Sequence, residues 1–254
     1  MKRVDLNCDM GELAEAVTGG AQEELLRYVT SANVACGGHA GDTAMMQATV
    51  EQCLRRGVAV GAHPGYEDRA NFGRIELTLS PEDVAASVHR QLLALAEIAA
   101  RCGARITHVK PHGALYNQAA RERELARGIA EGVARWKTDV VLVGLAGSAM
   151  LEEFRAAGFG VAAEAFADRR YEPDGSLRSR KFQDALLKNP DEAAAQALQI
   201  VQKGSVIAAD GDAVPLLAET ICIHGDTPGA AEIAATVHRA LRAAGIELNA
   251  LGAP

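Results

Sequence analysis

Short apolar runs alternate along the chain with longer segments in which apolar residues recur at helical spacing. The strand-like runs comprise residues 4–8, 31–36, 58–62, 106–109, 140–145, 161–166, 206–209 and 221–223. Most of them are continuously apolar, which is typical of parallel strands that are covered on both faces. Their alternation with helical segments predicts repeated βα units joined by right-handed crossovers.

The helical segments have recognisable beginnings and ends. Residues 43–56 and 81–102 carry apolar side chains at helical spacing, and a glycine follows each of them. Three helices are predicted to begin at a polar cap followed by proline, at Ser80-Pro81, Asn189-Pro190 and Thr227-Pro228. Roughly seven or eight parallel strands in this order predict a closed α/β barrel rather than an open sheet.

The barrel is expected to occupy residues 1–254 as a single domain, since one α/β barrel commonly fills a chain of this length. No Ser/Gly linker and no break in composition divides the chain. Residues 167–188 are the exception to the βα pattern, because they are polar. They predict a long surface loop, which either makes functional contacts or is mobile.

Polar and ionisable residues cluster directly after the strand-like runs. All strands of a parallel α/β barrel end on one face, so residues that are distant in the sequence are expected to converge there. These residues include Asp5, Asn7, Asp9, Glu12, Asn33, His39, Asp42, His63, Arg74, Lys110, His112, Tyr116, Asn117, Glu164, Asp168, Arg169, His224 and Asp226. For single members a helix cap is an alternative role, and Asp42 is the clearest example.

Composition and charge narrow the function. The net charge is −7 and no Lys/Arg stripe is apparent, which disfavours nucleic acid as a partner because its binding requires a basic surface. No stretch approaches the roughly 18 apolar residues of a membrane span, and the first residues lack the apolar run of a signal peptide. Together with five scattered cysteines and no CxxC pair, this predicts a cytoplasmic protein with reduced thiols.

Familiar cofactor motifs are missing from the sequence. No GxxxxGK[ST] loop is present, and the GxGxxA string at residues 158–163 runs from a helix into a strand, the reverse of a dinucleotide turn. His108 and His112 have the spacing of a zinc pair on a helix, but Pro111 and the strand character argue against a helix there. The Asp- and His-rich barrel mouth still leaves a divalent metal open.

Six stretches of the sequence resemble a known family. They are DLNCDMGE (5–12), SANVACGGHAGD (31–42), GAHPGY (61–66), HVKPHGALYN (108–117), EAFADRRY (164–171) and IHGDTP (223–228). From residue 5 to about residue 246 the chain resembles the LamB/YcsF family, the A subunits of prokaryotic ATP-dependent 5-oxoprolinase. The resemblance implies a seven-stranded βα barrel of the glycoside hydrolase/deacetylase type, which agrees with the strand pattern.

Two features limit which properties of the family can be expected of this chain. Gly38 precedes His39 where an aromatic residue is common in the family, so this corner of the pocket is expected to be wider or the His39 loop looser. The related deacetylases use an Asp-His-His metal site, for which Asp9, His63 and His112 are candidates, but the strings that surround that site are absent. No residue is therefore assigned as a metal ligand.

The resemblance implies a reaction in which 5-oxo-L-proline, ATP and water give L-glutamate, ADP and phosphate. It also implies two protein partners, the 5-oxoprolinase subunits B and C. In one division of labour these partners activate the lactam and this chain opens the ring. ATP is then consumed by the complex, with Mg²⁺ as the expected divalent metal, and direct contact between ATP and this chain is left open.

The predicted catalytic residues are Asp9, Glu12, His63, Lys110 and His112. Asp9 or Glu12 is expected to act as general base on water, and His112 or His63 to give a proton to the leaving nitrogen. Lys110 is expected to stabilise the developing oxyanion or a phosphate.

The predicted substrate-binding residues share a polar side chain and a place at the barrel mouth. They are Asn7, Asn33, His39, Arg74, Tyr116, Glu164, Arg169, His224 and Asp226. Arg74 is expected to assist Lys110 at the oxyanion. Arg169 is a candidate for the substrate carboxylate, because a guanidinium grips a carboxylate with two hydrogen bonds.

Two other functions remain open at this point. A stand-alone metal-dependent hydrolase of amides or N-acetyl groups would contain a metal and act without ATP. A non-catalytic scaffold that binds the lactam or positions its partners would tolerate substitutions at the barrel mouth. The density of ionisable residues on one face argues against the scaffold.

Overall fold

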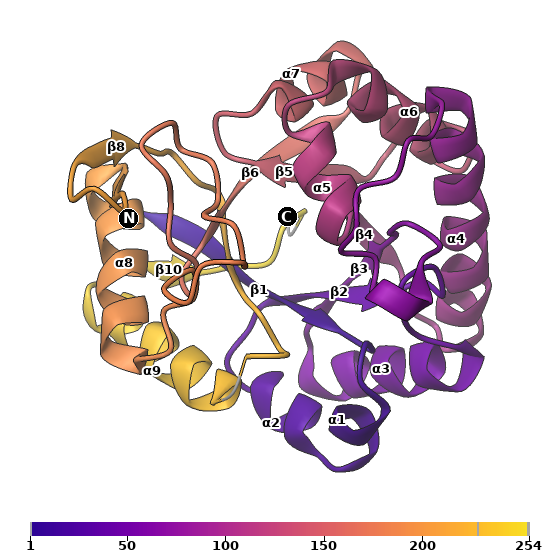
Figure 1. The fold of residues 1–254 in the computed structure, drawn as a ribbon. Coiled ribbons are helices and arrows are strands. Elements are labelled where there is room, and N and C mark those ends of the chain that lie inside the picture. Colours follow the sequence, from indigo (N-terminus) through magenta and orange to yellow (C-terminus); the bar gives the residue numbers. More distant parts are fainter. Residues whose placement is uncertain (1, 228, 253–254) are drawn as a thin grey trace.

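The computed structural model describes residues 2–227 and 229–252, and a closed barrel of seven parallel strands forms its centre (Figure 1). The barrel strands are β1 (Arg3–Met10), β2 (Ser31–Ala35), β3 (Ala59–His63), β4 (Ile106–Val109), β5 (Val141–Leu145), β6 (Gly160–Phe166) and β9 (Thr220–Ile223). β1 closes the barrel because it pairs with β2 on one side and with β9 on the other. The predicted α/β barrel is therefore confirmed.

Helices surround the barrel and form most of the connections between its strands (Figure 1). They are α1 (Ala14–Thr18), α2 (Ala21–Leu25), α3 (Thr43–Arg56), α4 (Pro81–Arg101), α5 (Gly113–Ala119), α6 (Arg123–Ala134), α7 (Ala149–Ala156), α8 (Pro190–Lys203), α9 (Ala230–Ala243) and the short 3-10 helix η1 (Arg69–Asn71). The prediction for residues 43–56 coincides with α3. The prediction for residues 81–102 ends one residue beyond α4.

The polar caps define the start of two helices as predicted. The Ser80 hydroxyl accepts a hydrogen bond from the Asp83 amide at 3.1 Å, and the Asn189 side chain accepts one from the Asp191 amide at 2.8 Å. The third predicted start is wrong, because α9 begins at Ala230 and Gly229 precedes it in a left-handed conformation without a side-chain cap. Pro228 lies outside the described residues.

The run at residues 206–209 is not a barrel strand, which corrects the prediction. It belongs to β7 (Ser205–Ile207), which pairs antiparallel with β8 (Ala213–Pro215) outside the barrel. Val206 is buried but Ile207 is 45% exposed, so only one side of this strand is covered. A last short strand, β10 (Glu247–Leu248), pairs with the beginning of β1.

The two sides of β1 are both buried but differ in chemistry. Leu6 and Cys8 belong to the apolar core between the strands and the helices. Asp5, Asn7 and Asp9 alternate with them and are almost fully buried inside the barrel. The barrel interior is therefore polar, which explains how a strand with three buried polar residues can lie at the centre of the fold.

Residues 167–188 form a long connection between β6 and α8, as predicted, but they are not purely a surface loop. Asp168 and Tyr171 are fully buried, and the Tyr171 hydroxyl accepts a hydrogen bond from the Phe166 amide at 2.8 Å. Single bridges join Arg169 to Leu186 and Tyr171 to Leu177 within the segment. These contacts fix the loop over one side of the barrel mouth.

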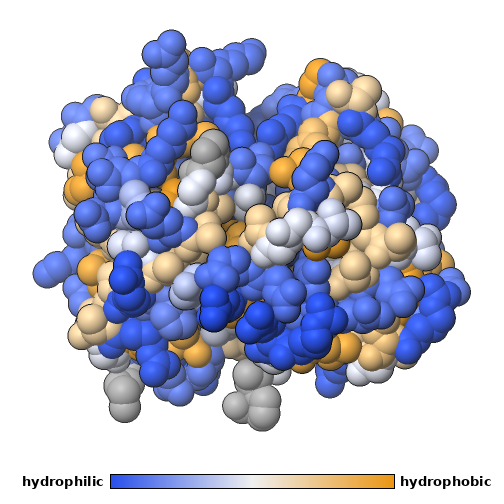
Figure 2. Space-filling view, turned by 90° about the horizontal axis from the view of Figure 1, so that it is seen from below, coloured by the Kyte–Doolittle hydropathy of each residue, from blue (hydrophilic) through white to orange (hydrophobic). Residues whose placement is uncertain are grey.

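The outer surface is mainly hydrophilic where it is visible in Figure 2. This view looks from below onto the side where α1, α2, α3 and α9 lie in Figure 1, and its hydrophobic residues are scattered. Single exposed hydrophobic residues are normal on protein surfaces. Among the described residues, no helix has both the length and the apolar character that crossing a membrane demands.

Candidate active site

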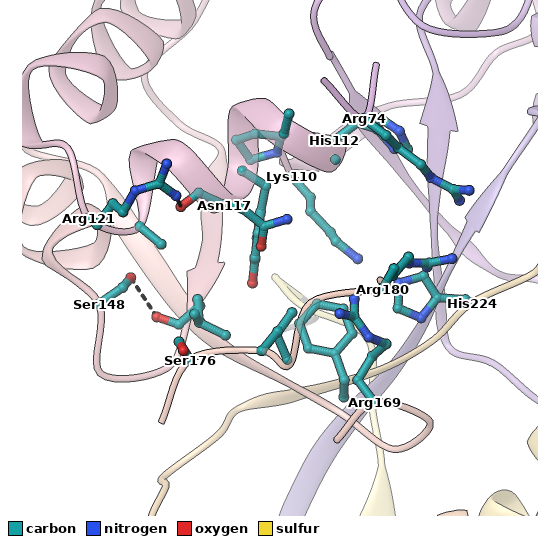
Figure 3. A pocket seen from close by; sticks show the side chains of 18 of the residues that line it. Arg74, Lys110, His112, Asn117, Arg121, Ser148, Arg169, Ser176, Arg180 and His224 are labelled. Carbon is teal, nitrogen blue, oxygen red and sulfur yellow. Dashed lines mark hydrogen bonds between the residues drawn. The ribbon is translucent and has the colours of Figure 1, made fainter. Parts of the chain in front are cut away.

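A cavity of about 650 Å³ opens at the carboxyl ends of the barrel strands (Figure 3). The predicted site residues that line it are Asp9, Glu12, His63, Arg74, Lys110, His112, Tyr116, Arg169, His224 and Asp226. They come from the barrel strands β1 and β3 and from the connections that follow the strands. The topology thus brings together side chains that are far apart in the sequence.

Four predicted residues do not line this cavity. Asn7, Asn33 and Glu164 are buried in the barrel interior, and His39 is buried behind Glu12. Asn33 donates hydrogen bonds to Asn7 at 2.8 Å and to Asp9 at 2.9 Å. These residues therefore support the side chains of the cavity wall from the interior.

Asp9, Lys110 and Glu164 form an interior ion cluster. The Lys110 ammonium lies 2.9 Å from Asp9 Oδ1 and 2.8 Å from Glu164 Oε1, and Lys110 is only 2% exposed. It also donates to Cys222 Sγ at 3.1 Å. An ammonium has three N–H donors, so these contacts use all of them.

The charges of the interior ion cluster stabilise one another. Burial would raise the pKa of Asp9, but the positive charges of His63 and Lys110 outweigh it and hold that pKa well below its usual value. Burial would lower the pKa of Lys110, but the charge of Asp9 outweighs it and raises that pKa well above its usual value. Asp9 and Lys110 are therefore both charged at neutral pH.

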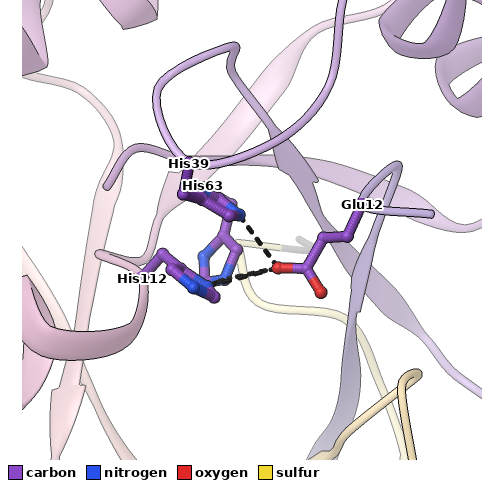
Figure 4. A group of neighbouring side chains, drawn as sticks. All are labelled: Glu12, His39, His63 and His112. Carbon is purple, nitrogen blue, oxygen red and sulfur yellow. Dashed lines mark hydrogen bonds and ion pairs between the residues drawn. The ribbon is translucent and has the colours of Figure 1, made fainter. Parts of the chain in front are cut away.

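Glu12, His39, His63 and His112 form an imidazole cluster beside the interior ion cluster (Figure 4). Glu12 Oε1 lies 2.9 Å from His39 Nε2 and 3.2 Å from His112 Nδ1. One ligand atom from each of the four side chains lies within 4.8 Å of every other, so the group is compatible with a divalent metal.

Backbone carbonyls determine which nitrogen of two imidazoles carries a proton. His63 Nδ1 lies 2.7 Å from the carbonyl oxygen of Lys110, and His112 Nε2 lies 2.9 Å from that of Phe72. A carbonyl oxygen can only accept, so both nitrogens must donate. The opposite nitrogens, His63 Nε2 and His112 Nδ1, face each other at 3.0 Å.

The neighbouring charges act differently on the three imidazoles. Burial would lower the pKa of His63, but the carboxylate of Asp9, 3.3 Å away, outweighs it and raises that pKa. Burial lowers the pKa of His39 to about 3 and also lowers that of His112. Burial would raise the pKa of Glu12, but its close polar contacts with His112 and His39 outweigh it and lower that pKa. Glu12 is therefore ionised, and His63 is the imidazole that most readily takes up a proton.

His108 lies deeper in the barrel than the predicted site and depends on a glycine of the next strand. His108 Nε2 is 2.9 Å from Asn33 Oδ1, and burial lowers the pKa of His108 to about 3. A Cβ atom at Gly61 would lie only 2.1 Å from His108 Nε2. Gly61 is thus required by the close approach of this ring to β3.

Arg74, Arg169 and Arg180 form a group of rim arginines at the cavity mouth. Arg74 lies 2.5 Å and Arg180 3.6 Å from the same atom, Asp226 Oδ2. Arg169 is only 5% exposed, forms no ion pair with a carboxylate of the described residues, and has an unpartnered Nε. Burial and the nearby Arg180 lower the pKa of Arg169 to about 10. The group therefore carries more positive charge than Asp226 can match.

His224 completes this side of the cavity. Its Nδ1 lies 2.9 Å from Asp168 Oδ1, and its ring stacks on Phe166 with centroids 5.3 Å apart. Figure 3 shows His224 with Arg169 and Arg180 on one side of Lys110, and Arg121 and Ser148 on the other side. The buried Asp168 fixes the orientation of the His224 ring.

In a comparison with known families, residues 4–254 match the LamB/YcsF family. The chain belongs to the LamB/YcsF family. A relative from Chloroflexus aggregans, named as the A subunit of 5-oxoprolinase, is 53% identical over 98% of this chain and 99% of its own length. A relative of the same designation from Methylococcus capsulatus is 47% identical over 99% of this chain and 96% of its own length. The designation describes these relatives as one component of a larger assembly.

Solved structures agree with this assignment. The lactam utilization protein from Thermus thermophilus has a TM-score of 0.90 and 44% identity, covering 98% of this chain and 99% of its own. A putative cellobiose-phosphate cleavage protein from Enterococcus faecalis has a TM-score of 0.57 and 16% identity, covering 97% and 96%. At that identity the likeness concerns the barrel fold alone.

Gly38, where many members of the LamB/YcsF family have an aromatic residue, does not widen this corner of the pocket. A Cβ atom at Gly38 would lie 2.4 Å from Gln91 Oε1, so the Gln91 side chain already occupies the space. Gln91 accepts a hydrogen bond from the Gly65 amide at 3.0 Å and donates one to the Gly65 carbonyl at 2.7 Å. The glutamine thus ties α4 to the loop after β3.

Several cavity residues were missed at the level of sequence. Arg121, Ser148 and Arg180 line the cavity but were not predicted as site residues. Arg180 lies in the polar segment 167–188, whose deviation from the βα pattern was the available signal. Nothing in the local sequence distinguishes Arg121 from other helix-end arginines.

Proposed function

We propose that this chain is the A subunit of an ATP-dependent 5-oxoprolinase and opens the ring of 5-oxo-L-proline to give L-glutamate. The observation that carries the proposal is the match over nearly the whole chain to relatives designated as the A subunit of 5-oxoprolinase. The name of the Thermus thermophilus protein supports the same substrate class, because 5-oxoproline is a five-membered lactam. The free cysteines of the chain agree with a cytoplasmic location.

The chemistry of the lactam explains the need for ATP. An amide carbon in a stable five-membered ring is a poor electrophile, so water attacks it slowly. Transfer of a phosphoryl group from ATP to the carbonyl oxygen makes this carbon open to attack and makes the overall reaction favourable. Subunits B and C would carry out this activation with ATP and its Mg²⁺, and this chain would open the ring.

Asp9 is the general base in this scheme. Its carboxylate is ionised, lines the cavity, and is held by Lys110 at 2.9 Å and by Asn33 at 2.9 Å. A fixed carboxylate beside a substrate pocket can take a proton from an attacking water. Lys110 then serves to hold Asp9 rather than to bind the oxyanion, since its donors are already occupied. Arg74 remains the candidate for the oxyanion or phosphate.

The leaving nitrogen requires a proton. His63 and His112 are the candidate donors, because they lie next to Asp9. His63 Nε2 lies 3.3 Å from Asp9 Oδ2 and 3.0 Å from His112 Nδ1, so one proton can be shared along this line. Both imidazoles line the cavity. A proton taken from water by Asp9 can therefore be returned to the nitrogen through the same group.

Arg169 is the candidate partner for the substrate carboxylate. Its guanidinium lines the cavity, is nearly buried and has no carboxylate partner among the residues that the structure describes. A buried cation without a counter-charge is unfavourable, so an anionic substrate that neutralises it is bound strongly. The α-carboxylate of 5-oxoproline has the required charge.

The proposal is tested by measuring glutamate release from 5-oxoproline with the purified chain, the candidate subunits B and C, and ATP. Activity is expected only when all three proteins and ATP are present. Omitting any one protein should remove it, and full activity of B and C without this chain would refute the proposed role. The purified chain alone should bind 5-oxoproline without releasing glutamate.

One observation favours a second function, a stand-alone metal-dependent amide hydrolase. The imidazole cluster offers four ligand atoms close together at the cavity wall. Such an enzyme would hydrolyse an amide or N-acetyl substrate without ATP and would lose activity on treatment with a chelator. ATP-independent hydrolysis by the purified chain would therefore favour this function over the first.

A further inference from the structure

We infer that Glu12, His63 and His112 form a binding site for one first-row transition-metal dication of the zinc type, with a coordination position open to the cavity. All three side chains line the cavity wall. His39, the fourth member of the imidazole cluster drawn in Figure 4, does not. The site differs from the ATP-associated Mg²⁺ of the proposed reaction and can be tested without any assay of that reaction.

Backbone hydrogen bonds prepare two imidazoles for a cation. Because His63 Nδ1 and His112 Nε2 each donate to a carbonyl oxygen, the other nitrogen of each ring presents a lone pair. These two lone pairs face each other at 3.0 Å beside the carboxylate of Glu12. Three converging acceptors repel one another unless a cation lies between them. Ligating histidines typically donate their far nitrogen to a carbonyl in this way.

The distances fit one small metal ion. The ligand atoms of the three side chains are 3.0 Å apart for His63–His112, 3.2 Å for His112–Glu12 and 3.8 Å for His63–Glu12. Tetrahedral zinc with bonds of roughly 2.0–2.1 Å separates its ligand atoms by about 3.3–3.4 Å. The ring planes of His63 and His112 meet at 88°, so both lone pairs can point at one centre.

His39 is not a fourth ligand in this arrangement. Its ring stacks on that of His112 with centroids 3.6 Å apart and 3° between the planes. A nitrogen lone pair lies in its ring plane, and one ion cannot lie in two parallel stacked planes. His39 Nε2 also donates to Glu12 at 2.9 Å. We therefore assign His39 to orienting the Glu12 carboxylate.

The ligand types define the class of metal. Two imidazoles and one carboxylate suit zinc, cobalt, nickel or iron, whereas Mg²⁺ prefers ligands that are all oxygen. Three protein ligands with an open position are typical of catalytic rather than structural zinc sites. A bound metal would replace the proton shared by His63 and His112, and Asp9, 3.3 Å from His63, would then supply the proton for the leaving nitrogen.

The test is metal binding by the purified full-length chain after removal of metals with a chelator. Titration with Zn²⁺ followed calorimetrically should show one ion per chain, and Mg²⁺ under the same conditions should show no such binding. Co²⁺ should give the visible absorption of a four- or five-coordinate ion. Elemental analysis after dialysis provides the stoichiometry independently.

Variants assign the ligands. His112→Asn should abolish stoichiometric binding and the Co²⁺ absorption, and Glu12→Gln, which keeps the shape of the side chain, should weaken binding by at least about tenfold. His39→Asn should weaken it less than His112→Asn. His238→Gln is the control, because His238 hydrogen bonds to Tyr28 outside the cavity, and it should bind as the unmodified chain does. Circular dichroism verifies that each variant is folded.

Three results would overturn the inference. They are the absence of stoichiometric Zn²⁺ binding by the unmodified chain, unchanged affinity in folded Glu12→Gln, and equal binding of Mg²⁺ and Zn²⁺. Loss of binding in His39→Asn as complete as in His112→Asn would overturn the three-ligand assignment.

Discussion

The interior ion cluster and the rim arginines are two charged groups of one cavity that differ in how completely their charges are matched. In the interior, Lys110 lies between the carboxylates of Asp9 and Glu164, and all its donors are occupied. At the rim, two arginines share the single carboxylate of Asp226, and the third forms no ion pair within the described chain. Matched charges hold a side chain in place, whereas unmatched charges attract a ligand. Under the proposed function, the comparison predicts that the interior ion cluster positions side chains and that the rim arginines bind the substrate.

The largest effect is expected from removing the cation of the interior ion cluster. Lys110→Met removes the cation that two buried carboxylates share and should lower the free energy of unfolding by about 3–5 kcal/mol. Urea denaturation followed by circular dichroism measures this change. Lys137→Met is the matched control, because the ion pair of Lys137 with Asp139 is exposed and contributes about 0–1 kcal/mol. Equal losses in both variants would contradict the comparison.

The second-largest effect is expected from replacing Asp9, the carboxylate that Lys110 holds in the interior ion cluster. Asp9→Asn should lower the turnover of the reconstituted three-subunit enzyme at least about a hundredfold, because the amide cannot accept the proton from water. Binding of 5-oxoproline should change little, since the rim arginines are intact. Asp139→Asn, at an exposed position outside the cavity, serves as the control. Near-normal turnover of Asp9→Asn would remove Asp9 as the base.

Asp5 extends the comparison to a carboxylate that pairs with no cation of the described chain. Burial raises its pKa from 3.8 to about 6 although Thr30, Ser31 and Thr220 donate hydrogen bonds to it. The folded chain therefore keeps this proton between pH 4 and 6 while the unfolded chain releases it, so folding stability falls as pH rises through this window. Well above pH 6 the penalty is complete, on the order of 3 kcal/mol.

Asp5→Asn removes the titrating carboxyl group and tests whether folding stability falls as pH rises. The difference in unfolding free energy between the variant and the unmodified chain should shift in favour of the variant as pH rises from about 4 to about 7. Urea titrations at several pH values measure it. A difference that is independent of pH would show that Asp5 is ionised in the folded chain throughout this range.

The smallest effect is expected at the rim. Arg169→Gln should raise the KM for 5-oxoproline about tenfold, equivalent to about 1.4 kcal/mol, with kcat largely retained. The free energy of unfolding should not fall, because the substitution removes a buried cation that no carboxylate of the described residues neutralises. Arg101→Gln on the outer surface of α4 is the control. An unchanged KM, or a loss of stability as large as that of Lys110→Met, would contradict the proposed distinction between residues that position and residues that bind.

The fold was largely predictable because the barrel strands are buried on both sides. Continuous apolar runs with helix caps between them identified the seven barrel strands, and the family resemblance agreed. The error at residues 206–209 arose because a three-residue strand of a hairpin has the same apolar signal as a short barrel strand. Only pairing partners distinguish the two, and these are set by tertiary contacts.

The convergence of the candidate residues on one cavity was predictable, but their arrangement within it was not. The position of Asp9, His63, Lys110 and His112 after strands indicated a shared face, and all four line the cavity. Their protonation and grouping depend on contacts that no local pattern encodes, such as the hydrogen bond from His112 to the Phe72 carbonyl. The occupied donors of Lys110 are likewise visible only in three dimensions.

The close approach of His108 to Gly61 links two positions on adjacent strands. Any side chain at residue 61 would collide with the imidazole, so substitution at this position is possible only with a smaller residue at position 108. The two sites should therefore vary together rather than independently during evolution. Since His108 also contacts Asn33, which in turn contacts Asp9, a change at one glycine of β3 would be transmitted to the carboxylate at the cavity wall.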